Sequence, residues 1–304
     1  TLGPVLREYI ISEYMNSINI PTTRSLAAIT TGEKVVRERI LPGAILVRIA
    51  NSHIRVGTFQ YFAARQMTKE IKILADYIIE RHFKLSLSSK NIYEKFLMEI
   101  IKSQANLISK WMSAGFIHGV MNTDNTCLSG ETIDYGPCAF LDNFDYNKVF
   151  SSIDYQGRYS YKNQPNIILW NLTRFAETIL PLIDNNLNKS IKKAEEILNE
   201  FASIYESNWI SIMGYKLGID EANKTDKNLI EEFLTLMQNQ QLDFTNSFYS
   251  LSFLIEKDQI EKEGPPKSHR IYSKIKSSDW YAKWTKRLNI NKKNLKKILK
   301  TLLI

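Results

Sequence analysis

The spacing of hydrophobic residues near the start of the chain predicts a helix followed by a small sheet. Residues 3–17 place Val5, Tyr9 and Ile10 on one side of a helix, and Pro4 suits its first turn. After a break at residues 19–23, apolar and β-branched residues gather in short runs bounded by turn residues. We expect three short strands, SLAAITT, VVRERIL and AILVRIA, separated by turns at Gly32-Glu33 and Pro42-Gly43.

From about Thr58 onward the pattern becomes helical. Apolar residues recur at helical spacing in six segments, over residues 68–83, 91–116, 166–183, 191–218, 227–240 and 244–257. EGPPKSH (263–269) is the clearest linker, and a helical tail with Trp280, Tyr281 and Trp284 follows it. We therefore predict an α+β chain with a partial small β lobe over 1–56, a large helical lobe over 57–262, and a linker with a basic helical tail over 263–304.

Composition narrows the class of protein. Of 304 residues, 44% are hydrophobic and 24% charged, which is typical of a globular chain, and no apolar run is long enough for a membrane span. Cys127 and Cys138 are the only cysteines, so a disulfide framework is excluded and a reducing compartment is favoured. We expect the cytoplasm of a bacterium, or a mitochondrion in a eukaryote. A zinc site would need more ligands than these cysteines and His118 provide.

The net charge of +8 is concentrated near the end of the chain, between Lys283 and Lys300. A nucleic-acid patch is one interpretation. The solvated face of a terminal helix fits better, because no stacking aromatic or base-reading motif accompanies the lysines. We therefore do not expect nucleic acid as a partner.

A polar loop, HGVMNTDNTCLSGETIDYG, interrupts the helical region between His118 and Gly136. Protein kinases carry H-R-D-x-x-x-x-N after a long helix and then D-F-G, and the Asn and second Asp bind metal ions that bridge the nucleotide phosphates. His118, Asn125 and Asp134 fit that spacing. Val120 stands where a kinase has its catalytic Asp, but Asp124 directly precedes Asn125. An ordinary turn stabilised by Asp and Asn side chains remains the alternative.

Charged residues before the loop add to this interpretation. Arg48 and Arg55 flank IANSH at the expected boundary between the lobes, and guanidinium groups bind phosphate oxygens with two donors. Glu8 lies inside the first helix, where a kinase has a glutamate that pairs with a phosphate-binding lysine. Surface arginines and an exposed helix glutamate remain the alternatives. Asn125 and Asp134 supply the oxygen ligands that Mg²⁺ prefers.

Longer stretches resemble one known family. HGVMNTDN, TIDYGP, FLDNFD and the segment LREYIISEYM…VGTFQYFA are similar to the SelO family, the YdiU-type proteins, over most of residues 3–183. The resemblance implies a protein-kinase-like fold that binds ATP in a reversed orientation. It also implies a protein adenylyltransferase, which moves AMP onto Ser, Thr or Tyr hydroxyls of protein substrates and uses Mg²⁺, with Mn²⁺ as a second possibility.

The resemblance also assigns roles by position. It implies a proton acceptor at Asp124, metal ligands at Asn125 and Asp134 with Asp134 also touching the nucleotide, phosphate contacts at Arg48 and Arg55, and a lysine-pairing helix glutamate at Glu8.

The sequence departs from the family at both ends. The family's glycine-rich loop and strand lysine precede the segment that matches Gly3, so we expect Glu8 to lack a lysine partner here. The family also continues past the position of Ile304. We therefore expect a fragment that binds nucleotide poorly, and the alternative to an active adenylyltransferase is an inactive kinase-like binding or regulatory module.

Overall fold

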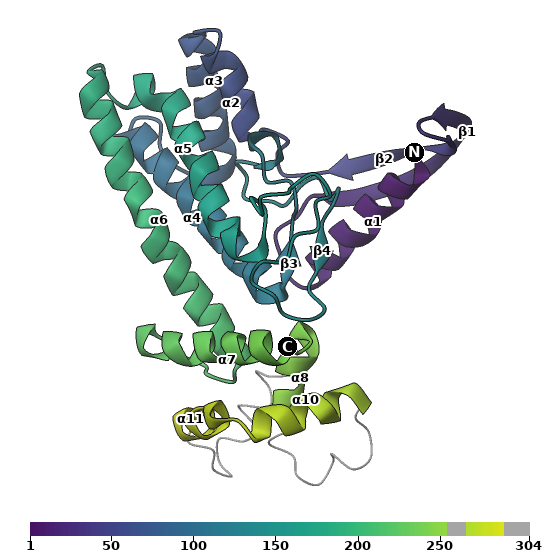
Figure 1. Cartoon of the computed structure of the whole chain (residues 1–304). Helices are drawn as coiled ribbons and strands as arrows, with labels where there is room; N and C mark the ends of the chain where they lie inside the picture. Colours follow the sequence, from purple (N-terminus) through teal and green to yellow (C-terminus); the bar gives the residue numbers. More distant parts are fainter. Residues whose placement is uncertain (254–265, 289–304) are drawn as a thin grey trace.

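Helices form most of the described chain, and its strands lie in two small antiparallel sheets. The computed structural model describes residues 1–253 and 266–288, and it has an α+β architecture. Helix α1 (Leu2–Ser17) packs along the hairpin of β1 (Arg24–Val36) and β2 (Ile40–Ile49). These three elements form an arm that projects from the helical body (Figure 1).

The hairpin differs from the three short strands that we expected. The turns predicted at Gly32-Glu33 and Pro42-Gly43 are wrong, because both pairs lie within strands and the chain turns at residues 37–39 instead. The register shifts around Gly43, so that β1 holds extra residues and bulges there. Gly32 accommodates the bulge with a φ of 74°. A proline is tolerated in β2 because a two-stranded sheet leaves one side of each strand unpaired.

Within the described residues, the helical body confirms the helices expected from hydrophobic spacing, and residues 254–257 of the last expected helix lie outside the described residues. It contains α2 (Val56–Ala63), α3 (Thr68–Ile78) with a π-helical end (Ile79–Phe83), α4 (Ile92–Ala114), α5 (Gln164–Ile183), α6 (Leu187–Lys216), α7 (Lys227–Gln240) and α8 (Phe244–Phe253). Helix α4 packs against α5 and α6, and all three run through the body in Figure 1. Gly115 ends α4 in the left-handed conformation typical of a helix C-terminus.

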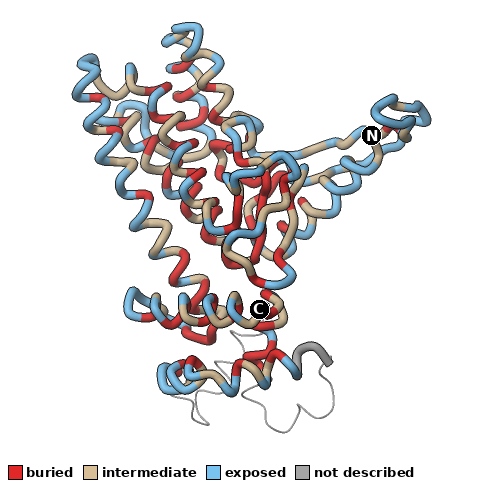
Figure 2. The backbone as a smooth tube through the Cα atoms, in the orientation of Figure 1, coloured by how far each residue is buried: buried red, intermediate tan, exposed pale blue. Residues whose placement is uncertain are grey.

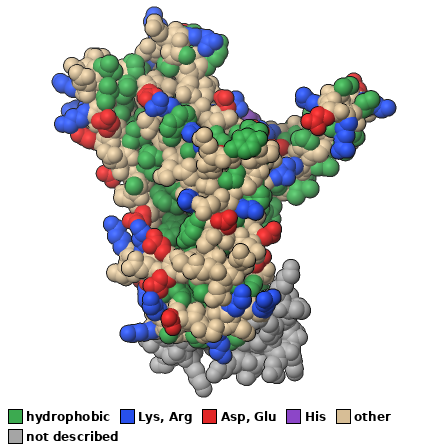
Figure 3. Space-filling model, in the orientation of Figure 1, with side chains coloured by type: hydrophobic (Ala, Val, Ile, Leu, Met, Phe, Trp, Pro, Cys, Tyr) green, Lys and Arg blue, Asp and Glu red, His purple; other side chains and the backbone are tan. Residues whose placement is uncertain are grey.

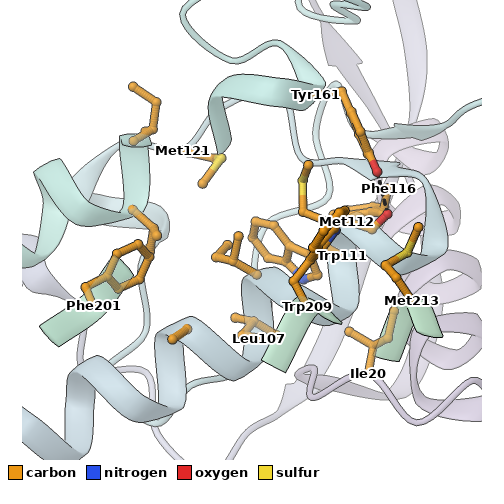
Figure 4. Packing of buried hydrophobic residues seen from close by; sticks show 14 of the residues in the cluster. Ile20, Leu107, Trp111, Met112, Phe116, Met121, Tyr161, Phe201, Trp209 and Met213 are labelled. Atoms are coloured by element: carbon orange, nitrogen blue, oxygen red, sulfur yellow. Dashed lines mark hydrogen bonds between the residues drawn. The ribbon is translucent and has the colours of Figure 1, made fainter. Parts of the chain in front are cut away.

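The buried residues concentrate where these helices meet. Figure 2 shows buried positions through the helical body, while much of the arm is exposed. Phe59, Phe96 and Phe175 meet edge to face, with ring centroids 5.1 and 5.7 Å apart. Figure 4 shows a second group, in which the Tyr161 hydroxyl donates a 2.6 Å hydrogen bond to the carbonyl of Met112. The helical body is therefore closely packed where it supports the polar loop.

The C-terminal helices α10 (Pro266–Lys276) and α11 (Asp279–Leu288) pack against this body. Trp280 and Trp284 are buried, and their ring nitrogens donate 2.8 Å hydrogen bonds to the carbonyls of Leu229 and Leu217. The linker expected up to His269 ends earlier, because Pro266 begins α10 and proline suits a first helical position. Residues 263–265 lie outside the described residues.

The basic end is described only in part, because residues 289–304 lie outside the described residues. Lys283 pairs with Glu232 at 2.8 Å, and Arg287 pairs with Asp226 at 2.6 Å. These two cations of α11 are thus engaged within the fold. The domain boundaries that we predict from the sequence remain a prediction.

Three further features concern the described residues alone. No helix of 1–253 or 266–288 has both the length and the apolar character that a bilayer span requires. Cys127 and Cys138 are buried free thiols. Within the same ranges, no three or more His, Cys, Asp or Glu side chains come together as a metal site.

Candidate active site

His118 joins the two ends of the polar loop, which starts after β3 (Phe116–Ile117). The imidazole is fully buried, with Nε2 2.8 Å from the carbonyl of Ile133 and Nδ1 3.4 Å from the amide of Val120. A carbonyl only accepts, so Nε2 carries the hydrogen and Nδ1 accepts from the amide. Burial lowers the pKa of His118, so the ring stays neutral. The histidine therefore places the residue before Asp134 beside the start of the loop.

Two amide side chains of α5 fasten the loop to the helical body. Gln164 accepts a 3.0 Å hydrogen bond from the His118 amide and donates one of 2.9 Å to the carbonyl of Phe116. Asn171 donates to the carbonyl of Met121 at 3.0 Å and to the Thr126 hydroxyl at 2.8 Å. Both amides are fully buried. The segment that holds Asp124 and Asn125 is consequently fixed at both ends.

Asn125 and Asp124 lie on a short 3₁₀ turn (Thr123–Asn125). The Asn125 side chain donates a 2.9 Å hydrogen bond to the carbonyl of Val120, so its carboxamide oxygen is left for another ligand. Val120 thus contributes only backbone groups to the site. The exposed Asp124 carboxylate packs so closely on Gly57, in the first turn of α2, that a Cβ at position 57 would overlap with Oδ1.

A charged trio links the arm to the polar loop. Nη2 of Arg48, on β2, lies 2.9 Å from Oε2 of Glu8 and 3.8 Å from Oδ1 of Asp134. The other oxygen of Glu8 accepts a hydrogen bond from the amide of Tyr135. Burial raises the pKa of Glu8, Arg48 opposes that rise and Asp134 adds to it. Asp134 itself is exposed, with a φ of 71° that Asp tolerates better than most residues.

Arg55 lies at the start of α2, next to the strand-like segment that follows Asn125. The Val56 amide donates to the carbonyl of Thr126 and the Leu128 amide to that of Ile54, each at 3.0 Å. Nε of Arg55 is buried and has no hydrogen-bond partner among the described residues.

The buried thiol of Cys127, in the segment that follows Asn125, is influenced by charged residues of the candidate site. Burial raises its pKa to about 12, and the carboxylates of Glu131 and Asp134 add to the rise, while Arg55 and Arg48 oppose it.

The structure groups the predicted site residues in two sets. Arg48 contacts both Glu8 and Asp134, and Asp124 lies against the start of α2, just after Arg55. The sequence predicts that Glu8 lacks a lysine partner. In the structure, the cationic partner of Glu8 is Arg48. The sharing of one cation by Asn125 and Asp134 stays a prediction.

Arg7 is a site residue that sequence reasoning missed. Its Nε donates a 2.9 Å hydrogen bond to the carbonyl of Tyr135, and its Nη2 donates to the carbonyl of Cys138. Together with Glu8, it holds α1 on the turn that follows Asp134. An arginine beside a glutamate on an amphipathic helix has the pattern of a solvated face, so only the docking of α1 reveals its role.

A cavity of about 550 Å³ lies elsewhere, between α4, α5, α6 and α7. Its walls include Tyr146, Tyr161, Phe201, Trp209 and Leu234. Phe201, Tyr161 and Trp209 can be followed in Figure 4. None of the predicted site residues lines it, so the candidate active site does not rest on this cavity.

Comparison with known proteins places the chain in a family. The model of the family described as protein adenylyltransferase SelO matches residues 1–303. Proteins named protein nucleotidyltransferase YdiU are similar: those of Clostridium botulinum (strain 657) and Clostridium perfringens (strain SM101) are each 52% identical over 287 residues, or 94% of this chain and 56% of the relative. The chain thus spans about half the length of the curated relatives it matches. The chain belongs to the SelO family.

Proposed function

We propose that this chain carries the nucleotide and metal site of a protein adenylyltransferase, which moves AMP from ATP to Ser, Thr or Tyr hydroxyls of proteins. Membership of the SelO family supports this reaction, and the relatives are named nucleotidyltransferases. The proposal includes a kinase-like arrangement, in which the arm is the remainder of a small lobe and the site lies where it meets the helical body.

The observation that carries the proposal is the trio of Glu8, Arg48 and Asp134. Three segments far apart in the sequence meet here, and the Arg48 guanidinium lies 2.9 Å from the Glu8 carboxylate and 3.8 Å from that of Asp134. A purely structural ion pair would not need a second, exposed carboxylate in a left-handed turn. A magnesium-bound triphosphate, by contrast, needs a cation for its phosphate oxygens and a carboxylate for its metal ion.

The residues present fit Mg²⁺ or Mn²⁺. Asn125 has a free carboxamide oxygen, and Asp134 presents a carboxylate whose side chain is 56% exposed. Mg²⁺ usually takes one or two protein oxygens and completes its shell with phosphate and water. The cation would neutralise phosphate charge as the bond to the leaving pyrophosphate breaks.

The remaining residues would bind and deprotonate the reactants. Arg48 and Arg55 would hold phosphate oxygens, and Glu8 would orient the Arg48 guanidinium through their ion pair. Asp124 accepts the proton of the acceptor hydroxyl. The hydroxyl oxygen then bonds to the α-phosphorus, the bond between that phosphorus and the bridging oxygen breaks, and pyrophosphate leaves.

Labelled ATP tests the reaction. The chain and the Clostridium botulinum relative are incubated with a protein mixture, Mg²⁺ and ATP labelled at either the α or the γ phosphate. We expect label from the α phosphate on protein and none from the γ phosphate. Transfer of the γ label alone would show a kinase, and Mg-ATP binding without transfer would show the inactive binding module.

A substitution at Asp134 tests the site itself. Asp134→Asn keeps the shape and the left-handed turn but removes the charge, so we expect transfer to fall about 100-fold or more. Glu33→Gln, on the exposed hairpin, is the matched control and should leave transfer unchanged. Wild-type labelling by Asp134→Asn would show that the metal assignment is wrong.

A further inference from the structure

Glu131 is a buried carboxylate that the proposed reaction does not use. Its residue is 7% exposed, and it lies in the segment between Asn125 and Asp134. Oε1 accepts a 2.9 Å hydrogen bond from Nδ2 of Asn51, and Oε2 accepts one of 3.0 Å from the backbone amide of the same residue. The Ser129 hydroxyl donates a third, of 2.9 Å, to Oε2. Glu131 therefore accepts hydrogen bonds from two donors of Asn51 at once.

Asn51 lies in the connection between the two predicted phosphate-binding arginines. Residues 50–55 connect β2 to α2, with Arg48 just before this connection and Arg55 at its end. The segment of Glu131 runs from Asn125 to Asp134. The hydrogen bonds of Glu131 thus join the piece of chain that carries both arginines to the piece that carries both predicted metal ligands.

The two segments are also paired at their other end. Backbone hydrogen bonds of 3.0 Å join Ile54 to Leu128 and Val56 to Thr126, close to Arg55. The hydrogen bonds between Glu131 and Asn51 join the same two segments at their opposite end, which is nearer to Arg48 and Asp134. The carbonyl of Asn51 also accepts a 3.3 Å hydrogen bond from Nε of Arg81, at the end of α3.

We propose that Glu131 is a positioning residue, which acts through Asn51 to fix the spacing between the phosphate-binding arginines and the metal loop. This inference rests on the proposed function. Only an acceptor with two free oxygens serves here, because both groups that Asn51 presents are donors. Glutamine would turn an NH₂ group toward one of them, so even this near-isosteric change should loosen the contact.

Hydrogen exchange tests the contact in the 304-residue chain without any ligand. The hydrogen bond from the Asn51 amide to a carboxylate should protect that amide, so we expect exchange at Asn51 to be about tenfold faster in Glu131→Ala. Glu99→Ala, which removes a half-buried carboxylate of α4 that pairs with Lys102, is the control and should leave residues 50–56 unchanged. Equal protection at Asn51 in Glu131→Ala and wild type would overturn the proposal.

A double-mutant cycle separates positioning from simple loss of stability. Mg-ATP affinity is measured by calorimetry for the wild type, Glu131→Ala, Arg55→Ala and the double variant, with folding checked by thermal unfolding. We expect Glu131→Ala to weaken Mg-ATP binding about tenfold, and to weaken it less when Arg55 is already alanine. The same fold-loss in both backgrounds, or no loss in either, contradicts the proposal. A wild-type chain with no measurable Mg-ATP binding contradicts nucleotide binding by this chain rather than the role of Glu131, and amide exchange then decides whether Glu131 holds Asn51.

Discussion

The Asp124 carboxylate occupies space that only a glycine at position 57 leaves open. In Gly57→Ala the new methyl group would overlap with Oδ1, and the flexible Asp124 side chain is the group that can move. We expect AMP transfer to fall about tenfold or more, because Asp124, the proposed base, would no longer reach the acceptor hydroxyl once it is displaced. Mg-ATP affinity should stay close to that of the wild type, since Arg48 and Asp134 are untouched. Radiolabel transfer and calorimetry measure the two quantities separately.

Gly3→Ala is the matched control, because a Cβ at position 3 meets no atom within 4 Å. A Gly57→Ala variant that transfers AMP as well as this control would show that Asp124 is not held where it acts. Loss of Mg-ATP binding together with transfer would instead show that the start of α2 as a whole has moved.

His118 allows a test of the loop that needs neither ATP nor a substrate. Because the Ile133 carbonyl only accepts, we expect nitrogen NMR to show the tautomer with hydrogen on Nε2. Burial lowers the pKa of His118 below its ordinary value, so the folded state binds this proton less readily than the unfolded chain does. Its contribution to stability is therefore present above about pH 6.5 and decreases as the pH falls below that value. A ring that is charged at pH 6.5 would contradict this assignment.

The sequence predicts part of the site, and the missing part has a physical reason. Asn125 and Asp134 could be proposed because they lie in one loop, at a spacing that backbone geometry preserves. The contact between Glu8 and Arg48 depends on how α1 packs on the hairpin and on the strand register, neither of which the spacing of these residues shows. Glu131 lies among Ser, Gly and Thr, where a carboxylate is typical of a turn, so its burial could not be anticipated.

At the scale of elements, hydrophobic spacing predicted the helices well and the strands poorly. A helix such as α4 repeats its apolar positions over many turns, so the signal accumulates along its length. The hairpin contains Gly32, Pro42 and Gly43, which favour turns elsewhere. Here pairing between two long strands outweighs those local preferences, and the bulge opposite Gly43 accommodates them.

Helix α11 is attached by the ion pairs of Lys283 and Arg287 and by two buried tryptophans, and the pair of Arg287 is the more buried of the two. Arg287 binds both oxygens of Asp226 at 2.6 and 3.1 Å, and Asp226 is 2% exposed. Arg287→Met leaves this carboxylate unpaired, so we expect the free energy of unfolding to fall by about 2 kcal/mol, less than for a fully buried pair because Arg287 is partly exposed. Trp280 and Trp284 should then show red-shifted fluorescence.

Two comparisons check this prediction. Lys283→Ala removes an exposed pair of the same helix and should cost less than about 1 kcal/mol. Burial alone would raise the pKa of Asp226. Arg287 and the Asn223 amide together lower that pKa by more than burial raises it, so the net shift is downward. The stabilisation is thus present above about pH 4 and is lost as the pH falls through the folded-state pKa. Equal urea midpoints for Arg287→Met and Lys283→Ala would exclude a special role for the pair.

At the scale of the whole molecule, hydrogen bonds attach the base of the arm to the body, while the outer part of the arm exposes apolar side chains. Hydrogen bonds of 3.0 and 2.9 Å join Thr23 and Pro21 to Thr132 of the body, and Arg7 and Glu8 hold the turn after Asp134. Farther out, the hairpin exposes Leu26, Ile29, Ile45, Val47 and Ile49, which are 37–66% exposed. Figure 3 shows hydrophobic side chains along the projecting arm.

This exposure predicts how the chain behaves in solution. Ile29 and Ile45 are direct cross-strand partners, and a two-stranded sheet has free edges on both sides, so apolar surface and unpaired backbone groups coincide on one element. We expect the 304-residue chain to self-associate as its concentration rises, and Ile29→Thr with Ile45→Thr to reduce that association while keeping strand propensity. Sedimentation velocity over a wide concentration range measures it. Ile73→Thr changes an isoleucine that is 69% exposed on α3 and should have no effect. If the control reduces association as much as the arm variant does, then total surface hydrophobicity, rather than the uncovered hairpin, governs the behaviour of the chain.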